Sequence, residues 1–290
     1  MTEFAHFQNI SVSFEQLSSD GGDVAGKVAV VKLNRPEKLN GLTIDMLRDL
    51  STTARTLARD PELRGIILAG EGASFCAGLD FGSALQPTRS ARFALATGFL
   101  PDIHGTNVFQ RACWDWRRVP VPVIAIVHGH CYGGGLQIAL GADFRITTAD
   151  SRWSVLETKW GLIPDMSGIR TLTDQLPLDQ AKWLTMSGEE LSGASATNLG
   201  LATTTAPDLT AATEEAWSRM HRLVGRSPDQ LAATKRLYMN TSKSPRATFR
   251  AERIEQLMLF ARENTVRARS AALKKVAPRY ARRGTWLGRG

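Results

Sequence analysis

Two glycine-centred turns are the part of the sequence with the clearest potential for chemistry. Residues 74–80 (SFCAGLD) follow one apolar run, and residues 130–137 (HCYGGGLQ) follow another and open a helical pattern. Glycine lets the backbone approach a ligand because it has no Cβ, and a helix N-terminus adds unpaired N–H donors. Two such N–H groups converging on one oxygen would form an oxyanion hole, each donor being worth about 3 kcal/mol. Tight packing of a helix against a strand would explain the same glycines without chemistry.

Several other kinds of site are excluded or not supported. No Gly-Lys-Ser/Thr follows the triple glycine, no Gly-x-Ser-x-Gly or His-Glu-x-x-His occurs, and neither turn matches a dinucleotide-binding fingerprint. The three cysteines (Cys76, Cys113 and Cys131) fit neither a disulfide framework nor a metal site, which favours a reducing compartment. His128 and His130 match no catalytic motif. We therefore interpret these histidines and cysteines as packing residues and predict no metal.

The elements that must position the two turns are apolar strands separated by helices. Helical spacing of apolar residues begins after Thr43, a plausible cap, and ends before Pro61. A shorter helix is expected from Gly134 or Gly135 to about Leu140. Continuous apolar strands alternating with helices predict a parallel sheet covered by helices, which is an α/β fold. The predicted strands are 28–33, 65–69, 123–127 and 144–147.

The remaining chain is predicted to be helical. Residues 81–118 mix Gly, Pro, Arg and aromatic residues, and we interpret them as an irregular helical segment over the substrate pocket. Simple packing of amphipathic helices is the alternative explanation for each of the aromatic residues. Beyond about Pro207 we expect no further strand, and helices over 211–224, 228–239 and 247–276. This pattern divides the chain into a core, residues 1–206, and a C-terminal helical region with a basic tail, residues 207–290.

The net charge of +8 is confined to the end of the chain. From Arg262 onward there are nine Lys or Arg and one acid, Glu263, which together account for the whole excess. We interpret this tail as a solvated helix face with a frayed end. Contact with a polyanionic ligand or a neighbouring subunit is the alternative, and nucleic-acid binding is not expected because no recognised module accompanies the charge. The longest apolar run, 119–127, is too short to cross a membrane, and we expect a soluble cytoplasmic protein.

Four motifs occur in a characteristic order along the chain. They are residues 34–40 (NRPEKLN), 75–80 (FCAGLD), 133–135 (GGG) and 160–164 (WGLIP), and Gly188, Ser192, 194–200 and 225–235 continue the pattern. Over about residues 28–240 the sequence is similar to the enoyl-CoA hydratase/isomerase (crotonase) family. The resemblance implies a crotonase-like spiral of repeated β-β-α units with a C-terminal helical region that trimerises. It also implies an acyl-CoA substrate, a homotrimer or hexamer, and no cofactor, since coenzyme A is part of the substrate.

Site residues follow from this resemblance by position. The oxyanion hole would be formed by the backbone N–H groups of Leu79 and Gly134. The residues expected to contact coenzyme A are Lys38, Leu39, Ala77 and Asp80, and Lys38 is equally well explained as a solvated loop lysine.

The acid–base positions depart from the family pattern at one residue. Family hydratases carry glutamates at the positions of Gln137 and Glu157, and an amide cannot usefully accept a proton. Asp165 stands where many hydratases have glycine, and it resembles the dienoyl-CoA isomerase branch, which pairs a glutamate with an aspartate at this spacing. That branch also has an aspartate at the position of Gln137. Asp165 is alternatively explained as a turn or helix cap.

The leading hypothesis from the sequence is an enoyl- or dienoyl-CoA isomerase. Glu157 would remove or return a proton beside the thioester, Asp165 would serve the more distant carbon, and Gln137 would orient rather than transfer. Burial beside the acyl chain would raise the pKa of the base toward neutrality. The alternatives are an enoyl-CoA hydratase, in which Glu157 acts on a water positioned by Gln137 or Asp165, and a non-catalytic acyl-CoA-binding protein. The acyl group is not specified by the sequence.

Overall fold

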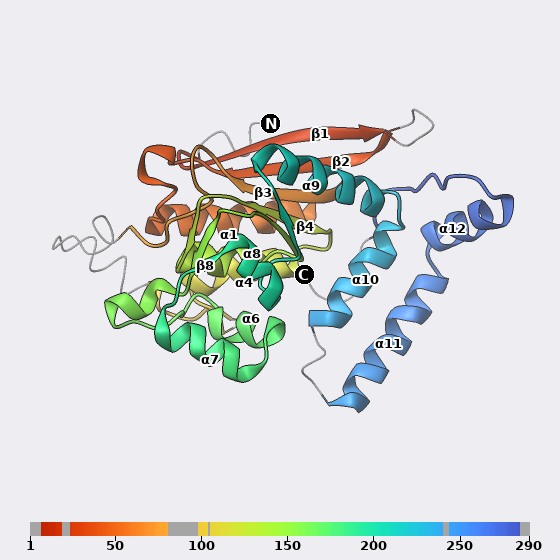
Figure 1. Ribbon diagram of the computed structural model, residues 1–290. Coiled ribbons are helices and arrows are strands. Elements are labelled where there is room, and N and C mark those ends of the chain that lie inside the picture. The colour runs from red at the N-terminus through yellow and green to blue at the C-terminus, as the bar shows by residue number, and fades with distance from the viewer. Residues whose placement is uncertain (1–6, 19–23, 81–97, 104, 240–243, 285–290) are drawn as a thin grey trace.

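Parallel strands form the centre of the molecule and set the positions of the loops that follow them. A computed structural model describes residues 7–80, except 19–23, together with 98–103, 105–239 and 244–284. The larger sheet has the order β1-β2-β3-β4-β6-β9, in which β1 is antiparallel to β2 and all other pairs are parallel (Figure 1). Its strands are β1 Ile10–Ser18, β2 Val24–Leu33, β3 Leu63–Gly70, β4 Val123–Val127, β6 Phe144–Thr148 and β9 Thr204–Ala206.

The four predicted strands and their parallel pairing are confirmed. The apolar stretches of β3 and β4 are buried on both faces, as expected for a parallel sheet with helices on each side. A second sheet of three short strands, β5 His130–Tyr132, β7 Arg152–Ser154 and β8 Leu191–Ser192, lies beyond the carboxyl end of β4. The crotonase-like α/β fold expected from the resemblance is therefore present.

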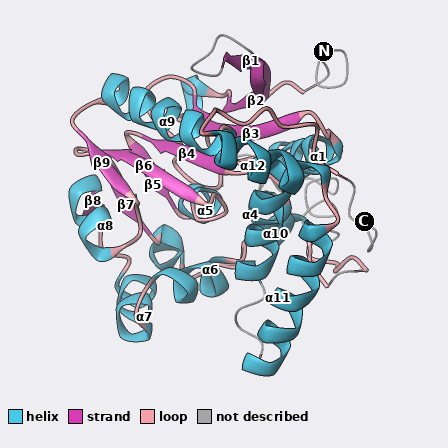
Figure 2. Cartoon of the chain, turned by 90° about the vertical axis from the view of Figure 1, so that its right-hand side faces the viewer, coloured by secondary structure: helices cyan, strands magenta, loops and turns pink. Residues whose placement is uncertain are grey.

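Helices cover both faces of the larger sheet. Thr43 caps α1, its side chain accepting a hydrogen bond from the Met46 N–H as predicted. Figure 2 shows α9 on one side of the sheet and α1 and α4 on the other. The helices of this part are α1 Ile44–Arg59, α4 Val108–Arg118, α5 Gly134–Ala139, α6 Gly168–Gln175, α7 Leu178–Ser187, α8 Gly193–Leu199 and α9 Leu209–Val224. Two 3₁₀ helices are Pro36–Lys38 and Leu156–Trp160.

The prediction of an irregular segment over 81–118 is wrong for its second half. Helix α4 is regular, because Asn107 and Gln110 form a reciprocal capping box at its start. Its Phe109 and Trp116 side chains are buried in the core rather than arranged over an open pocket. Residues 81–97 lie outside the described residues, so their expected position over the substrate pocket stays a prediction.

In the described part of the C-terminal region, α9 is followed by the helices α10 Pro228–Met239, α11 Pro245–Phe260 and α12 Glu263–Lys274. The single helix predicted over 247–276 is wrong, because the chain breaks between α11 and α12 at Ala261 and Arg262. Helical apolar spacing continues through the break, and for this reason the sequence pattern did not reveal it. Across the described ranges, the structure contains no helix that is both long and apolar enough to span a membrane.

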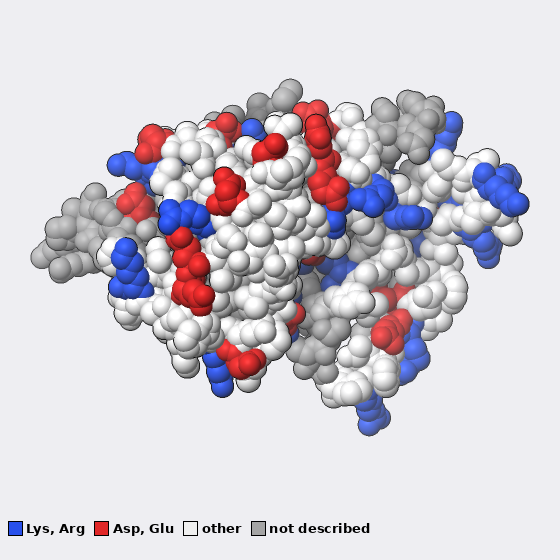
Figure 3. Space-filling view, in the orientation of Figure 1, with Lys and Arg blue, Asp and Glu red and all other residues white. Residues whose placement is uncertain are grey.

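The frayed end predicted for the basic tail is also wrong up to Gly284. After α12 the chain runs back to the core, where the Arg283 guanidinium donates to the carbonyl oxygens of Ala58 and Asp60 at 3.1 and 3.0 Å. The Gly284 N–H donates to the Asp229 carboxylate at 2.8 Å. Backbone carbonyls are good acceptors for a buried guanidinium, so this contact anchors the segment. Most cationic side chains in the described part of the tail are exposed, and Figure 3 shows blue side chains gathered near α12. They are Arg267, Arg269, Lys274, Lys275, Arg279 and Arg282.

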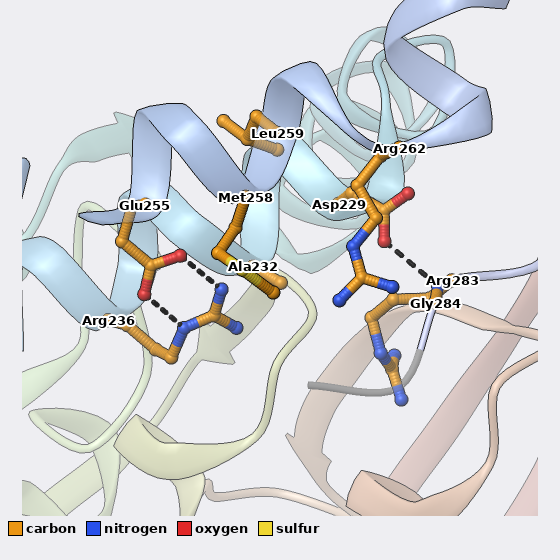
Figure 4. A pocket seen from close by; sticks show the side chains of 9 residues that line it. All are labelled: Asp229, Ala232, Arg236, Glu255, Met258, Leu259, Arg262, Arg283 and Gly284. Atoms are coloured by element: carbon orange, nitrogen blue, oxygen red, sulfur yellow. Dashed lines mark hydrogen bonds and ion pairs between the residues drawn. The ribbon is translucent and has the colours of Figure 1, made fainter. Parts of the chain in front are cut away.

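A small cavity lies where this returning segment meets α10 and α11 (Figure 4). Arg236 and Glu255 form a two-pronged ion pair on one side, with nitrogen–oxygen distances of 2.8 and 2.7 Å. Arg262 lies on the other side, close against Gly284. These contacts connect the C-terminal helices to one another and to the core.

Candidate active site

Loops that follow parallel strands meet at one edge of the sheet. The segments that follow the carboxyl ends of β2, β3 and β4 are residues 34–43, 71–80 and 128–133, respectively. Ligands of open parallel sheets bind at this edge, because strand ends there present loops and helix N-termini. Both glycine-centred turns lie in these loops.

The two glycine turns are in contact with each other. Gly78 has a φ of 93°, and a Cβ placed on it would lie 3.0 Å from the Tyr132 carbonyl oxygen and 3.8 Å from the Gly134 nitrogen. A Cβ on Gly135 would lie 2.5 Å from the Cys76 carbonyl oxygen. Side chains would therefore force the turns apart, so here the glycines are needed for close backbone approach.

The N–H groups of Leu79 and Gly134 occupy adjoining positions in these turns. Leu42 N–H donates to the Gly78 carbonyl and Asp80 N–H donates to the Leu42 carbonyl, so the intervening N–H of Leu79 faces away from Leu42. Gly134 is the first residue of α5, where helix N–H groups have no partner within the helix. Neither N–H donates to an acceptor within the described segments. The structure thus provides two unused donors next to each other.

The loop after β2 is fixed by Asn40, a residue that the sequence analysis did not single out. Its side chain is fully buried, accepts from the Arg35 N–H, and donates to the carbonyls of Glu71 and Ser74 at 2.9 and 2.8 Å. Asn40 therefore joins the loops after β2 and β3. Its φ of 56° lies in the left-handed region, which asparagine tolerates better than most residues, but no local sequence pattern reports these contacts.

The four residues expected to contact coenzyme A lie in these joined loops. Ala77 N–H donates to the Leu39 carbonyl at 2.9 Å. Asp80 forms an ion pair with Arg35 at 3.2 Å, so its carboxylate already has a cationic partner. Lys38 is exposed. The structure brings the four together, and their contact with coenzyme A remains a prediction.

Gln137 and Glu157 are hydrogen-bonded partners. The Gln137 side-chain nitrogen donates to Glu157 Oε1 at 2.6 Å. Gln137 Oε1 accepts from the Gly168 N–H, the first of α6, at 2.8 Å. Gln137 is 1% exposed, so both polar ends of its amide are used inside the protein.

The second carboxylate oxygen of Glu157 is buried and has no hydrogen-bond partner among the described residues. The carboxylate faces the second glycine turn, because a Cβ on Gly133 would lie 3.2 Å from Glu157 Oε1. Burial raises the pKa of the Glu157 carboxyl, interactions with its own backbone N–H and with the Gln137 amide oppose this, and repulsion from Asp165 adds a smaller increase. A buried carboxylate oxygen without a partner is costly, which is typical of a group that acts on a ligand.

Asp165 lies in the turn that leads into α6. Its side chain does not cap that helix, since the N-cap residue is Ser167. Burial raises the pKa of the Asp165 carboxyl as well. Repulsion from the Asp165 carboxylate contributes to the raised pKa of Glu157. The helix-cap explanation of Asp165 is thus not supported, whereas its position in a turn agrees with the other alternative.

The histidines and cysteines near the turns pack as predicted. His128 and His130 bond to the Gly72 carbonyl and the Ser74 hydroxyl, both at 2.8 Å. Burial raises the pKa of the Cys76 thiol to about 12, so it is protonated at neutral pH and a poor nucleophile. In the parts of the chain that the structure describes, no group of three or more His, Cys, Asp or Glu could hold a metal ion.

The fold and these paired turns define the class: a crotonase-fold α/β protein. The chain belongs to the enoyl-CoA hydratase/isomerase family, whose profile matches residues 23–282. A Bacillus anthracis enoyl-CoA hydratase structure superposes with a TM-score of 0.82 at 23% identity, covering 94% of this chain and 99% of that one. An enoyl-CoA hydratase structure from Polaromonas sp. JS666 gives a TM-score of 0.75 at 26% identity, covering 92% and 99%.

Sequence relatives have activities on different acyl groups. The (E)-benzylidenesuccinyl-CoA hydratase of Thauera aromatica is 30% identical over 73% of this chain and 79% of that protein. A short-chain-enoyl-CoA hydratase of Clostridium acetobutylicum is 31% identical over 61% of this chain. That match spans 64% of the Clostridium protein, just under two thirds of its length. The family is therefore established.

Proposed function

We propose that this protein is an acyl-CoA isomerase that forms a thioester enolate and moves a carbon–carbon double bond. The observation that supports the proposal most strongly is the buried, unpartnered oxygen of Glu157 beside the second glycine turn. In this proposal the thioester oxygen accepts hydrogen bonds from the N–H groups of Leu79 and Gly134. Lys38, Leu39, Ala77 and Asp80 line the path of coenzyme A, and no cofactor is needed beyond it.

The proposed reaction uses two carboxyl groups, one that takes a proton from the substrate and one that gives a proton back. Glu157, as carboxylate, takes a proton from the α-carbon of a 3-enoyl thioester, and the electrons move onto the thioester oxygen. Asp165, as carboxylic acid, then gives a proton to the γ-carbon, which places the double bond between the α- and β-carbons. The raised pKa values of both carboxyls favour such exchange near neutral pH. Solvent restores the starting protonation states.

Hydration of a 2-enoyl-CoA is the second candidate, because the relatives compared above are named hydratases. A water would then be held by Glu157 and Asp165, beside a Gln137 amide that is already bonded to Glu157 and to the Gly168 N–H. Mass spectrometry of products from 3-enoyl- and 2-enoyl-CoA substrates distinguishes the two reactions. An isobaric product with a moved double bond supports isomerisation. A product heavier by one water contradicts it and supports hydration.

Replacing Asp165 by Asn separates the two proton transfers. We expect double-bond migration to fall by about 10²-fold, because the acid for the γ-carbon is lost. Exchange of α-protons with heavy water should persist, because Glu157 is intact. Both rates are measured by NMR on one substrate. Equal loss of exchange and migration would contradict the separate role of Asp165.

We also propose that the protein is a homotrimer or a pair of trimers in the cytoplasm. Two groups of exposed apolar side chains support self-association, because soluble monomers rarely leave large apolar patches in contact with water. Their side chains are each more than half exposed. One surface, near α6 and α7, contains Leu162, Ile163, Ile169, Leu178, Trp183 and Met186, and the other, on and beside α11 and α12, contains Phe249, Leu257, Phe260, Val266, Leu273 and Val276.

Light scattering during gel filtration tests this assembly. We expect a particle of three or six times the 31.7 kDa chain mass. Charged substitutions at Leu257 and Phe260 should dissociate it, whereas a charged substitution at the exposed Asp150 position, such as Asp150→Lys, should not. A native protein that elutes as a monomer at micromolar concentration would contradict the proposal.

A further inference from the structure

Gln137 connects the two segments that carry the proposed proton-transfer groups. It lies in α5, with its amide directed between Glu157 and the start of α6. Glu157 belongs to the 3₁₀ helix after β7, and Asp165 comes three residues before Gly168, whose N–H binds the same amide. One buried side chain is therefore bonded to the proposed base and to the turn that carries the proposed acid.

The orientation of this amide is determined by its neighbours. A backbone N–H can only donate, so the Gly168 N–H requires the amide oxygen opposite it. The amide nitrogen must then face Glu157 Oε1, to which it donates at 2.6 Å. This bond occupies one carboxylate oxygen and leaves Glu157 Oε2 as the oxygen without a partner.

The contact with α6 leaves little freedom for movement. A Cβ on Gly168 would lie 2.6 Å from Gln137 Oε1 and 2.7 Å from the Pro164 Cβ. Glycine at this position therefore lets the helix start close against the amide. A residue with a side chain at 168 would push the α6 N-terminus, and the Asp165 turn with it, away from Glu157.

We propose that Gln137 is a positioning residue that holds Glu157 with one oxygen occupied and one directed to substrate, and at the same time fixes the Asp165 turn. The proposal rests on the proposed function for its chemical meaning. The positioning role also explains why residue 137 is a glutamine. An ionised glutamate at 137 could not donate a hydrogen bond to Glu157. Gln137 thus acts through Glu157 and Asp165.

The charges around Glu157 determine the sign of the expected pH effect. Asp165, before α6, repels the carboxylate, and the buried Cys113 thiol of α4 is protonated because burial raises its pKa well above the usual range. The Gln137 hydrogen bond lowers the pKa of Glu157. Removing that bond should raise this pKa. Glu157 acts as a base only when ionised, which it is above its pKa. The acidic limb of the pH–rate profile, where activity rises with pH, should therefore move to higher pH.

Gln137→Met tests the proposal, with Gln175→Met as a matched control. Methionine keeps the length of the side chain but makes neither hydrogen bond. Gln175 lies at the other end of α6, where its Oε1 accepts from Arg145 at 3.1 Å. For Gln137→Met we expect kcat to fall by about 10- to 100-fold with little change in KM, and the acidic limb to move upward. Gln175→Met should leave the limb in place.

A carbon NMR titration gives a readout that does not depend on turnover. Protein labelled at the glutamate carboxyl carbons shows the Glu157 signal, identified by its loss in Glu157→Gln. This signal should titrate at higher pH in Gln137→Met than in the native protein. An unchanged titration would overturn the positioning role, whether or not a substrate turns over. Absence of turnover by the native protein would overturn only the proposed function.

If Gln137→Met does not fold, Gln137→Glu replaces it as the test variant. Its carboxylate retains an acceptor for the Gly168 N–H and loses only the donor to Glu157. Two adjacent carboxylates would share a proton, so the Glu157 signal should again titrate at higher pH. Titration at the native pH, or full activity with an unmoved acidic limb, would overturn the proposal.

Discussion

Replacing Glu157 by Gln should lower kcat by about 10²–10⁴-fold, because the base for the α-proton is lost. Glutamine has nearly the same shape and keeps an oxygen that can accept the hydrogen bond from Gln137, so acyl-CoA should bind with nearly native affinity. Steady-state kinetics and calorimetric titration with a substrate analogue measure the two effects. A loss in kcat with little change in affinity is the signature of a group needed in the transition state.

Glu189→Gln is the matched control for this variant. Glu189 is exposed, and its carboxylate accepts from the Trp183 indole at 2.6 Å, a bond that an amide oxygen can also accept. The control should retain native kcat. Full activity in Glu157→Gln would remove Glu157 from the mechanism.

Replacing Gly134 by Pro should lower kcat by about 10²–10³-fold relative to Gly134→Ala, because proline has no N–H to donate to the thioester oxygen. Both variants add a Cβ, which would lie 2.8 and 2.9 Å from the side-chain ends of Leu42 and Met166. Gly134 is the first residue of α5, a position at which helices tolerate proline. Both variants share the added Cβ, and the proline variant additionally replaces the N–H hydrogen by the ring Cδ.

Thermal unfolding of both variants provides the control for damage to the fold. We expect the alanine and proline proteins to have similar midpoints and different kcat values. Equal kcat values in the two variants would show that the Gly134 N–H does not stabilise the transition state.

Long apolar strands and the capped helix α1 were predictable because local patterns determine them. The strands β3 and β4 are apolar runs buried on both faces, and Thr43 caps α1 from within the same segment. The strands of the second sheet are two or three residues long, so they carry no periodic signal. Strand β1 is partly exposed on an edge, and its pairing with β2 depends on the tertiary fold.

The proposed site was predictable only where one short motif contains it. The glycine turns are visible in the sequence because a single residue type permits close backbone approach. Gln137 is 20 residues from Glu157 and 31 from Gly168, and no local pattern reports that one amide binds both. Arg283 similarly binds carbonyls more than 220 residues away in the sequence. No local pattern reports these contacts, and for this reason the sequence predicted a solvated tail.

Deuterium incorporation at the α-carbon tests the central claim most directly. The native protein and Glu157→Gln are incubated in heavy water with saturated and 3-enoyl-CoA thioesters, and the α-carbon is followed by mass spectrometry and NMR. We predict rapid incorporation with the native protein and incorporation at least about 10²-fold slower with the variant. Binding of the thioesters without incorporation by the native protein, or equal incorporation by the variant, would contradict enolate formation by Glu157.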